Sequence, residues 1–152
     1  MLESQDAKTE DLKQINQLIR LSKAHWGYDR EFMDHFMEKF GCTKEYLKSA
    51  ITKIYFINNE LIAIYSFSTH SDGLFELDYF LIHPDYIGKG LGRELWHACC
   101  TTAQGVGKDE FILWSDPNAE NFYLKMGCDK IGTRKSPLLE NRYAPILKFK
   151  IT

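Results

Sequence analysis

The sequence predicts an α+β domain in which a central mixed, mostly antiparallel β-sheet is flanked by helices in α/β/α layers. Residues 9–50 carry apolar side chains at helical spacing, whereas residues 54–82 form apolar runs separated by short turns. Beyond residue 90, helical and strand-like segments alternate, which predicts a helical crossover and one parallel strand pair. The 152 residues fit a single domain, 1–152.

Three helices are predicted in the first third of the chain. A Thr followed by two acids at residues 9–11 is typical of a helix start, and we expect this helix to end within residues 24–27. A second amphipathic helix is expected over residues 29–40, closed by Gly41. A short third helix is expected over residues 43–50.

The next segment predicts a meander of three strands. Apolar residues 54–57 and 61–67 flank Asn58-Asn59-Glu60, a pattern that favours a β-hairpin. A turn at residues 71–73 then leads into a longer strand over residues 74–82.

The last part of the chain predicts alternating helices and strands. The expected elements are a helix over 91–103, a strand over 110–114, a helix over 118–126 stopped by Gly127, and strands over 130–133 and 146–151.

Composition narrows the functional classes. A formal net charge of −2 does not favour nucleic-acid binding through a basic surface. No apolar run approaches the ~20 residues of a membrane helix, and the acidic, polar N-terminus does not resemble a signal peptide. We therefore expect a cytoplasmic protein that binds neither nucleic acid nor membrane.

Cysteine and histidine spacing predicts neither a disulfide framework nor a metal site. The chain contains Cys42, Cys99, Cys100 and Cys128, and none of them forms a C-x-x-C pair. We expect reduced thiols. The histidines lack H-x-x-x-H and H-E-x-x-H spacing, so no metal ligands are predicted.

The most informative segment is a glycine-rich loop between a strand and a helix. Pro84 cannot continue a β-ladder, and Ile87-Gly88-Lys89-Gly90-Leu91-Gly92 leads directly into the next helix. Amides at a helix N-terminus lack internal partners, and glycines let a phosphate approach them closely. The pattern predicts an anion site, best suited to a pyrophosphate. Its spacing fits neither the P-loop nor the dinucleotide fingerprint, and a tight structural turn remains the alternative.

The segment Phe80-Leu81-Ile82-His83-Pro84, followed by the glycine loop, resembles motif A of the GNAT acetyltransferases (the GCN5-related N-acetyltransferase superfamily). The resemblance implies the GNAT acyl-CoA N-acyltransferase fold, with the loop amides on the CoA pyrophosphate and the strand backbone on pantetheine. Ile87 stands where the family pattern has Gln or Arg, and Lys89 or Arg93 could supply positive charge nearby. The cofactor-binding residues expected from the resemblance are Phe80, Leu81, Ile82, Ile87, Gly88, Lys89, Gly90, Leu91, Gly92, Arg93, Asn118 and Tyr123.

Residues 116–128 resemble motif B of the same family. Asp116 takes the position where the family often has Asn, and Cys128 takes that of a Phe. The two motifs cover residues 76–128 in the family order. The resemblance implies that Tyr123 lies near the CoA sulfur and can protonate the leaving thiolate.

Helical spacing places Tyr123 at the edge of an apolar stripe formed by Ala119, Phe122 and Met126, where a phenol could reach a cleft. The alternative interpretation is a half-buried core tyrosine whose hydroxyl is satisfied.

Glu76 and Asp78 are the candidate general bases. They are two residues apart on a strand and share one face, while the other face is apolar. An amine with a pKa of about 10.4 must lose a proton before it attacks a thioester. Glu76 matches the glutamate base of histone acetyltransferases within the resembled family. A relay through water, or an ordinary solvated strand face, remains the alternative.

Aromatic and basic residues are candidates for the acceptor site. Trp26 and Tyr28 lie between the first two expected helices, in a region that commonly walls the acceptor site in the resembled family. Arg142 and Tyr143 are expected in the loop between the last two strands. Ordinary core packing is the alternative for Trp26.

The resemblance implies an acyltransferase of the EC 2.3.1 class that uses acetyl-CoA as co-substrate. The acetyl group would pass to a primary amine of a small molecule, a peptide N-terminus or a lysine, by direct attack in a ternary complex. The alternative is a non-catalytic acyl-CoA-binding sensor or regulatory module. Dimers are common in the family, so a homodimer is a further possibility.

Overall fold

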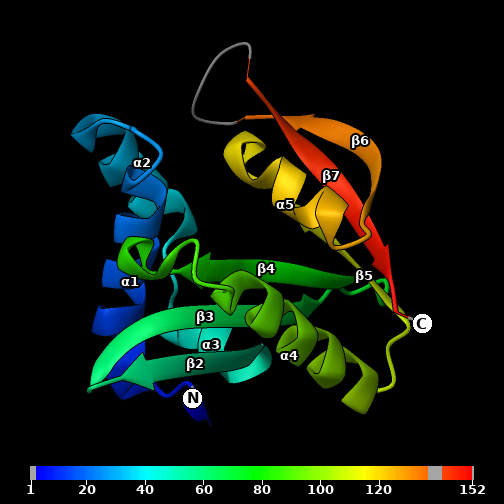
Figure 1. Ribbon diagram of the computed structural model, residues 1–152, viewed down its shortest axis with the longest axis horizontal. Coiled ribbons are helices and arrows are strands. Elements are labelled where there is room, and N and C mark those ends of the chain that lie inside the picture. Colours follow the sequence, from blue (N-terminus) through cyan, green and yellow to red (C-terminus); the bar gives the residue numbers. More distant parts are fainter. Residues whose placement is uncertain (1–2, 137–141, 152) are drawn as a thin grey trace. The chain divides into compact units, whose positions relative to one another are not determined.

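The computed structural model describes residues 3–136 and 142–151, and apart from a first strand at residues 3–6 its helices and strands follow the order expected from the sequence (Figure 1). The elements are β1 (Glu3–Asp6), α1 (Leu12–Ala24), α2 (Arg30–Phe40), α3 (Lys44–Ser49), β2 (Ile51–Ile57), β3 (Glu60–Thr69), β4 (Phe75–Ile82), α4 (Leu91–Gly105), β5 (Glu110–Trp114), α5 (Glu120–Lys125), β6 (Asp129–Lys135) and β7 (Tyr143–Lys150). Short 3-10 turns are η1 (Thr9–Asp11), η2 (Pro84–Tyr86) and η3 (Pro117–Ala119).

Among the described residues, the strands form one seven-stranded sheet in the order β1-β2-β3-β4-β5-β7-β6. The β1–β2, β2–β3, β5–β7 and β6–β7 pairs are antiparallel, and β4 pairs with β5 in parallel through Glu76 and Ile112. The α+β class with a mixed, mostly antiparallel sheet is therefore confirmed, including the parallel pair that the helical crossover predicted.

The chain forms two compact units, each built from separate segments. The first unit contains Met1–Phe67 and Tyr79–Gly92, and the second contains Ser68–Asp78 and Arg93–Thr152. Strand β4 and helix α4 each begin in one unit and end in the other. The assignment of residues 1–152 to one domain stays a prediction.

The core of the first unit forms between α1 and the β2–β3 hairpin. Ile15, Leu18 and Ile19 of α1 are buried in one cluster with Ile54 and Ile64 of the two strands. Their spacing along α1 is the one that the sequence predicted. Burying these side chains supplies the main favourable term in the folding of this unit, about 1.5–3 kcal/mol for each fully buried aliphatic residue.

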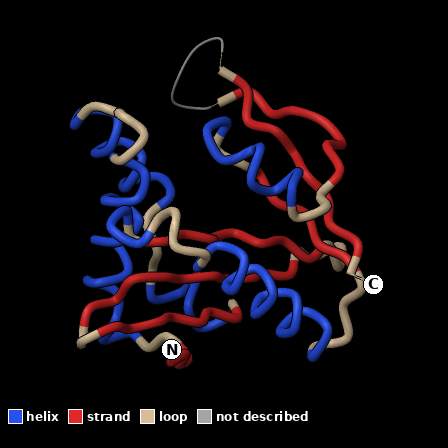
Figure 2. The backbone as a smooth tube through the Cα atoms, viewed as in Figure 1, coloured by secondary structure: helices blue, strands red, loops and turns tan. Residues whose placement is uncertain are grey.

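The turn between β2 and β3 is the predicted hairpin turn. Asn58 and Asn59 both have positive φ, at 50 and 66°, as a two-residue type I′ turn requires. Asn tolerates this conformation better than most non-glycine residues. The two strands consequently lie side by side, with Ile57 paired to Glu60 (Figure 2).

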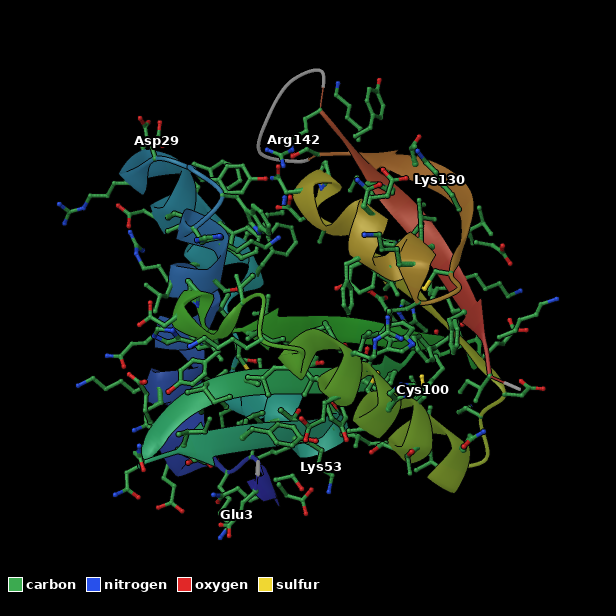
Figure 3. The ribbon with its side chains drawn as sticks, in the orientation of Figure 1. Glu3, Asp29, Lys53, Cys100, Lys130 and Arg142 are labelled. Atoms are coloured by element: carbon green, nitrogen blue, oxygen red, sulfur yellow. The ribbon has the colours of Figure 1, made fainter. Side chains whose placement is uncertain are left out.

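Side chains cap two of the predicted helices at their first turns. The Asp29 carboxylate accepts a hydrogen bond of 2.8 Å from the Phe32 amide at the start of α2 (Figure 3). Thr43 Oγ1 accepts one of 3.1 Å from the Tyr46 amide at the start of α3. These bonds satisfy amides that the helices cannot pair internally.

The core of the second unit is an aromatic cluster around Trp96 of α4. The Trp96 ring lies 5.5 Å from Phe111 of β5, 5.1 Å from Phe149 of β7 and 5.8 Å from Tyr123 of α5, measured between ring centroids. Tilted and edge-on arrangements such as these are favourable for aromatic pairs. The cluster fixes α4 and α5 on this part of the sheet.

Two strands differ from the sequence-based expectation. Residues Glu3–Asp6 form strand β1, which pairs with β2, although all four are exposed and polar. Tyr143 is the first residue of strand β7 and not a loop residue. In both cases the strand is defined by pairing with its neighbour, which an alternation of apolar residues does not reveal.

Among residues 3–136 and 142–151, no helix has the length and hydropathy that crossing a bilayer would require.

Candidate functional site

The glycine loop of the first unit has an open, left-handed backbone. Gly88 and Gly90 have φ of 81 and 83°, and a Cβ added at either would meet no described atom within 4 Å. Residues 87–90 are all exposed. The glycines therefore serve the backbone conformation and not close packing, which leaves room for a ligand to approach the main chain.

Hydrogen bonds within the loop fix its first half. The His83 amide donates to the Ile62 carbonyl of β3 at 2.7 Å, and His83 Nδ1 accepts from the Asp85 amide at 3.1 Å. The Tyr86 and Ile87 amides donate to the carbonyls of His83 and Pro84. Among the residues expected to bind CoA, Ile87 thus has its amide engaged within the loop, and its side chain is 47% exposed.

Positive charge is present beside the loop. Lys89 Nζ lies 5.4 Å from the centroid of the Tyr86 ring, a cation–π contact. Leu91 and Gly92 begin α4 and are half-buried, and Arg93 follows as an exposed residue in the part of α4 that belongs to the second unit.

The strand before the loop is held by its neighbours in the first unit. Phe80, Leu81 and Ile82 are half-buried, and the Ile82 carbonyl accepts a hydrogen bond from Ser22 Oγ of α1 at 3.4 Å. The preceding Tyr79 donates its hydroxyl to the Phe40 carbonyl at 2.8 Å. The three predicted strand residues thus stand in a well-anchored segment that leads into the loop.

Glu76 in the second unit is paired with a histidine, His70. Its carboxylate Oε1 lies 2.6 Å from Nε2 of His70, and the Glu76 side chain is only 13% exposed. Burial and the nearby Asp78 carboxylate raise the pKa of Glu76, while the hydrogen bond and charge of His70 oppose this rise. The apolar face of the strand is confirmed, because Phe75 and Leu77 are both 4% exposed.

His70 was not found by the sequence reasoning. It precedes the turn at residues 71–73 and belongs to no catalytic motif. The sequence signal that could have identified it is its position: His70 precedes the turn at residues 71–73, and Glu76 follows that turn.

Tyr123 is more deeply placed than its helical spacing predicts. It is the one buried residue of α5, 7% exposed, whereas Ala119, Phe122 and Met126 are half-buried. Burial, with smaller contributions from Cys99, Cys128 and Asp116, raises the pKa of the Tyr123 phenol. Its hydroxyl therefore stays protonated at neutral pH.

Asn118 takes part in a polar cluster at the start of α5. Asp116 Oδ1 accepts from both the amide and the side-chain Nδ2 of Asn118 at 2.8 Å, and lies 3.5 Å from a guanidinium nitrogen of Arg142 (Arg142 is labelled in Figure 3). Burial lowers the pKa of Arg142. The structure thus brings two predicted site residues, Asn118 and Arg142, onto one carboxylate.

The remaining acceptor-site candidates lie in separate units. Trp26 is 41% exposed and contacts His25 at 5.1 Å between ring centroids, and Tyr28 stacks on Phe32 at 4.4 Å, all in the first unit. Tyr143, in the second unit, is 55% exposed. Core packing does not account for the exposed Trp26.

Within the described part of the chain, no group of His, Cys, Asp and Glu side chains is arranged to hold a metal ion. All four cysteines are free thiols.

The sequence matches the family model described as "Acetyltransferase (GNAT) domain" over residues 5–136. A comparison of the sequence with curated proteins gave no match.

Solved structures of acetyltransferases share the fold. PaiA N-acetyltransferase from Thermoplasma acidophilum, in complex with coenzyme A, superposes with a TM-score of 0.80 at 18% identity over 99% of both chains. A probable acetyltransferase from Staphylococcus epidermidis gives 0.78 at 15% identity over 100% of both chains. The ribosomal-protein-S18-alanine N-acetyltransferase from Escherichia coli gives 0.72 at 18% identity, covering 100% of this chain and 95% of that one.

Proposed function

Because the chain belongs to the GNAT acetyltransferase family, an acyltransferase family, we propose that it transfers the acetyl group of acetyl-CoA to a primary amine by direct attack in a ternary complex. The observation that carries the proposal is the open glycine loop, in which Gly88 and Gly90 hold left-handed backbone at the start of α4. When bound, acetyl-CoA supplies the thioester that the amine attacks.

On the cofactor side, we assign the CoA diphosphate to the amides from Gly88 onward, since those of Asp85, Tyr86 and Ile87 are used within the loop. Helix α4 adds the partial positive charge of its N-terminus. Lys89 and Arg93 would supply the cationic side chains that Ile87 does not. The backbone of Phe80–Ile82 would align pantetheine, and Asn118 and Tyr123 complete the proposed set.

The acceptor is proposed to be a cationic amine that loses a proton before attack. Glu76 is the proposed base, because its raised pKa lies closer to neutrality than that of an exposed glutamate and thereby improves proton abstraction. Asp78, or water held between the two carboxylates, is the second candidate. Two acids on one strand face also favour a positively charged substrate.

Tyr123 is the proposed acid for the leaving thiolate. Its phenol remains protonated at neutral pH, as a proton donor must. We expect Tyr123→Phe to lower kcat at least tenfold and to leave CoA affinity within about twofold. Tyr55→Phe is the matched control, because Tyr55 is also 7% exposed but belongs to the β2–β3 core.

We propose that four further residues contribute to the acceptor site: Trp26, Tyr28, Arg142 and Tyr143. Single alanine variants at these positions would change KM for the acceptor with little change in CoA affinity if the proposal is right.

The proposal is tested by following thiol release from acetyl-CoA in the presence of an amine panel. The panel includes an aliphatic diamine, a peptide with an internal lysine and a peptide that begins with alanine, the last because a structural neighbour is an alanine N-acetyltransferase. We expect amine-dependent release and a matching acetylated product by mass spectrometry. Binding of acetyl-CoA without release for any amine would favour the sensor alternative and contradict the transferase.

A matched pair of variants tests the base. Glu76→Gln removes the carboxylate, whereas Glu110→Gln alters a glutamate on the neighbouring strand that pairs with Lys148 at 2.8 Å. We expect kcat to fall by about 100-fold only in Glu76→Gln. Equal activity of the two variants would remove Glu76 from the mechanism.

A further inference from the structure

We propose that His70 is a positioning residue for Glu76: it holds one carboxylate oxygen and keeps the group ionised, so that the other oxygen faces the ammonium group of the acceptor. This inference rests on the proposed function, in which Glu76 removes the proton from the amine. His70 lies outside both segments that resemble GNAT motifs, and it is identified through its contact with Glu76.

The contact between the two side chains is short and directed. Nε2 of His70 lies 2.6 Å from Oε1 of Glu76, shorter than the usual 2.9 Å for N–H···O bonds. The His70 side chain is 40% exposed, whereas that of Glu76 is 13% exposed. The imidazole thus joins a largely buried carboxylate to solvent.

The turn before β4 fixes the backbone of His70. The His70 amide donates to the Leu74 carbonyl at 2.8 Å, and the Gly73 amide donates back to the His70 carbonyl at 2.9 Å. Asp72 accepts from the Leu74 amide at 2.9 Å, and Gly73 has a φ of 91°. Because the backbone is held at both ends of the turn, the imidazole needs little ordering to reach Glu76.

Among the described side chains that act on Glu76, His70 is the one that favours the ionised carboxylate. Burial and the Asp78 carboxylate act in the opposite direction. On the neighbouring strand β5, Glu110 is engaged by Lys148 of β7 at 2.8 Å. Without His70, burial and like charge would leave Glu76 protonated to a higher pH.

The proposed reaction depends on whether Glu76 is ionised or protonated. The ionised carboxylate accepts a proton from the ammonium group, and the freed lone pair forms the new C–N bond at the thioester carbonyl carbon. The C–S bond then breaks, and the thiolate takes up a proton from the proposed acid Tyr123. The nitrogen, which is cationic after the attack, loses its second proton to give the neutral amide, and that proton restores the Tyr123 phenol. A Glu76 that is already protonated cannot take the first step, so the rate follows its ionised fraction.

The test is the pH dependence of kcat for wild type, His70→Ala and His70→Gln, measured by thiol release with the amine that the panel identifies. We expect the acid limb of the kcat profile to move up by about one pH unit in His70→Ala. Below the limb, kcat of this variant should therefore be about tenfold lower than that of wild type. At high pH its kcat should return to within about twofold of wild type. His70→Gln keeps a hydrogen-bond donor but not the imidazole, and its profile should fall between those of wild type and His70→Ala.

His97→Ala is the matched control, because His97 is an exposed histidine on α4 and we expect its profile to be unchanged. A uniform loss of kcat at every pH in a folded His70→Ala protein would overturn the inference, since a purely structural role gives that result. If Glu76→Gln is inactive and His70→Ala keeps the wild-type profile, the inference fails while the proposed base stands. If Glu76→Gln keeps wild-type kcat, the proposed base itself is wrong.

Discussion

Substituting Gly90 by alanine probes the loop on which CoA binding depends. Gly90 has a φ of 83°, and a Cβ added there meets no described atom within 4 Å. The methyl group therefore causes no clash, and the cost comes from the backbone alone. A left-handed conformation costs an L-residue about 1–2 kcal/mol.

This strain can appear in either of two measurements. If the loop keeps its conformation in Gly90→Ala, the free energy of unfolding falls by about 1–2 kcal/mol and CoA affinity is unchanged. If the loop relaxes in the free protein, CoA must restore the strained form, and its Kd rises about fivefold to thirtyfold. We expect the two losses together to amount to about 1–2 kcal/mol.

Urea unfolding and calorimetric titration with CoA, on the same preparation, measure the two losses. Gly105→Ala is the matched control, since Gly105 also has no atom within 4 Å of an added Cβ but lies in the last turn of α4 without a positive φ. The control should gain up to about 1 kcal/mol of stability and keep its CoA affinity. Gly90→Ala with unchanged stability and unchanged affinity would refute the reasoning, because the loop would then not need a glycine there.

Three further outcomes are expected. Ile87→Arg places a guanidinium at an exposed position of the loop. The Kd of this variant for CoA should be about threefold to tenfold lower than that of wild type at low salt and should approach the wild-type value at high salt. A ratio of the two Kd values that does not change with salt would contradict this. Gly127→Ala introduces a side chain at a φ of 104° and 3.3 Å from a Phe149 ring carbon, so urea unfolding should show a loss of about 1–2 kcal/mol or more; unchanged stability would be the contrary result. Cys100 on α4 (labelled in Figure 3) is the least buried of the four cysteines, and the neighbouring Cys99 lowers its pKa. Iodoacetamide at pH 8 should therefore modify Cys100 first, and peptide mapping that finds another cysteine modified earlier would disprove this.

Much of the fold follows from local sequence signals. The Asn58-Asn59 turn was predicted because its chemistry acts within four residues. The helix starts at residues 29 and 43 were predicted for the same reason, although their side-chain caps were seen only in the structure. Strand β1 was missed because its polar, exposed residues become a strand through pairing with β2. Its Asp6 also forms an ion pair of 2.6 Å with Lys53, a contact between positions far apart in the sequence.

The candidate site was predictable in its motifs but not in its contacts. The glycine-rich loop lies between strand β4 and helix α4, as the sequence predicted, whereas its role as an anion site stays a prediction. The burial of Tyr123 was not predicted, because η3 and α5 together form a 3-10 turn followed by only six α-helical residues, and a single 3.6-residue period does not describe that path. The contact between His70 and Glu76 needed the geometry of the turn that joins them.

The central claim is that main-chain amides from Gly88 onward bind the diphosphate of CoA. Calorimetric titration of the pure protein with CoA, without and with excess inorganic pyrophosphate, tests it most directly. We predict saturable binding at one site per chain that pyrophosphate weakens. The absence of any saturable heat with CoA and with acetyl-CoA would contradict the claim.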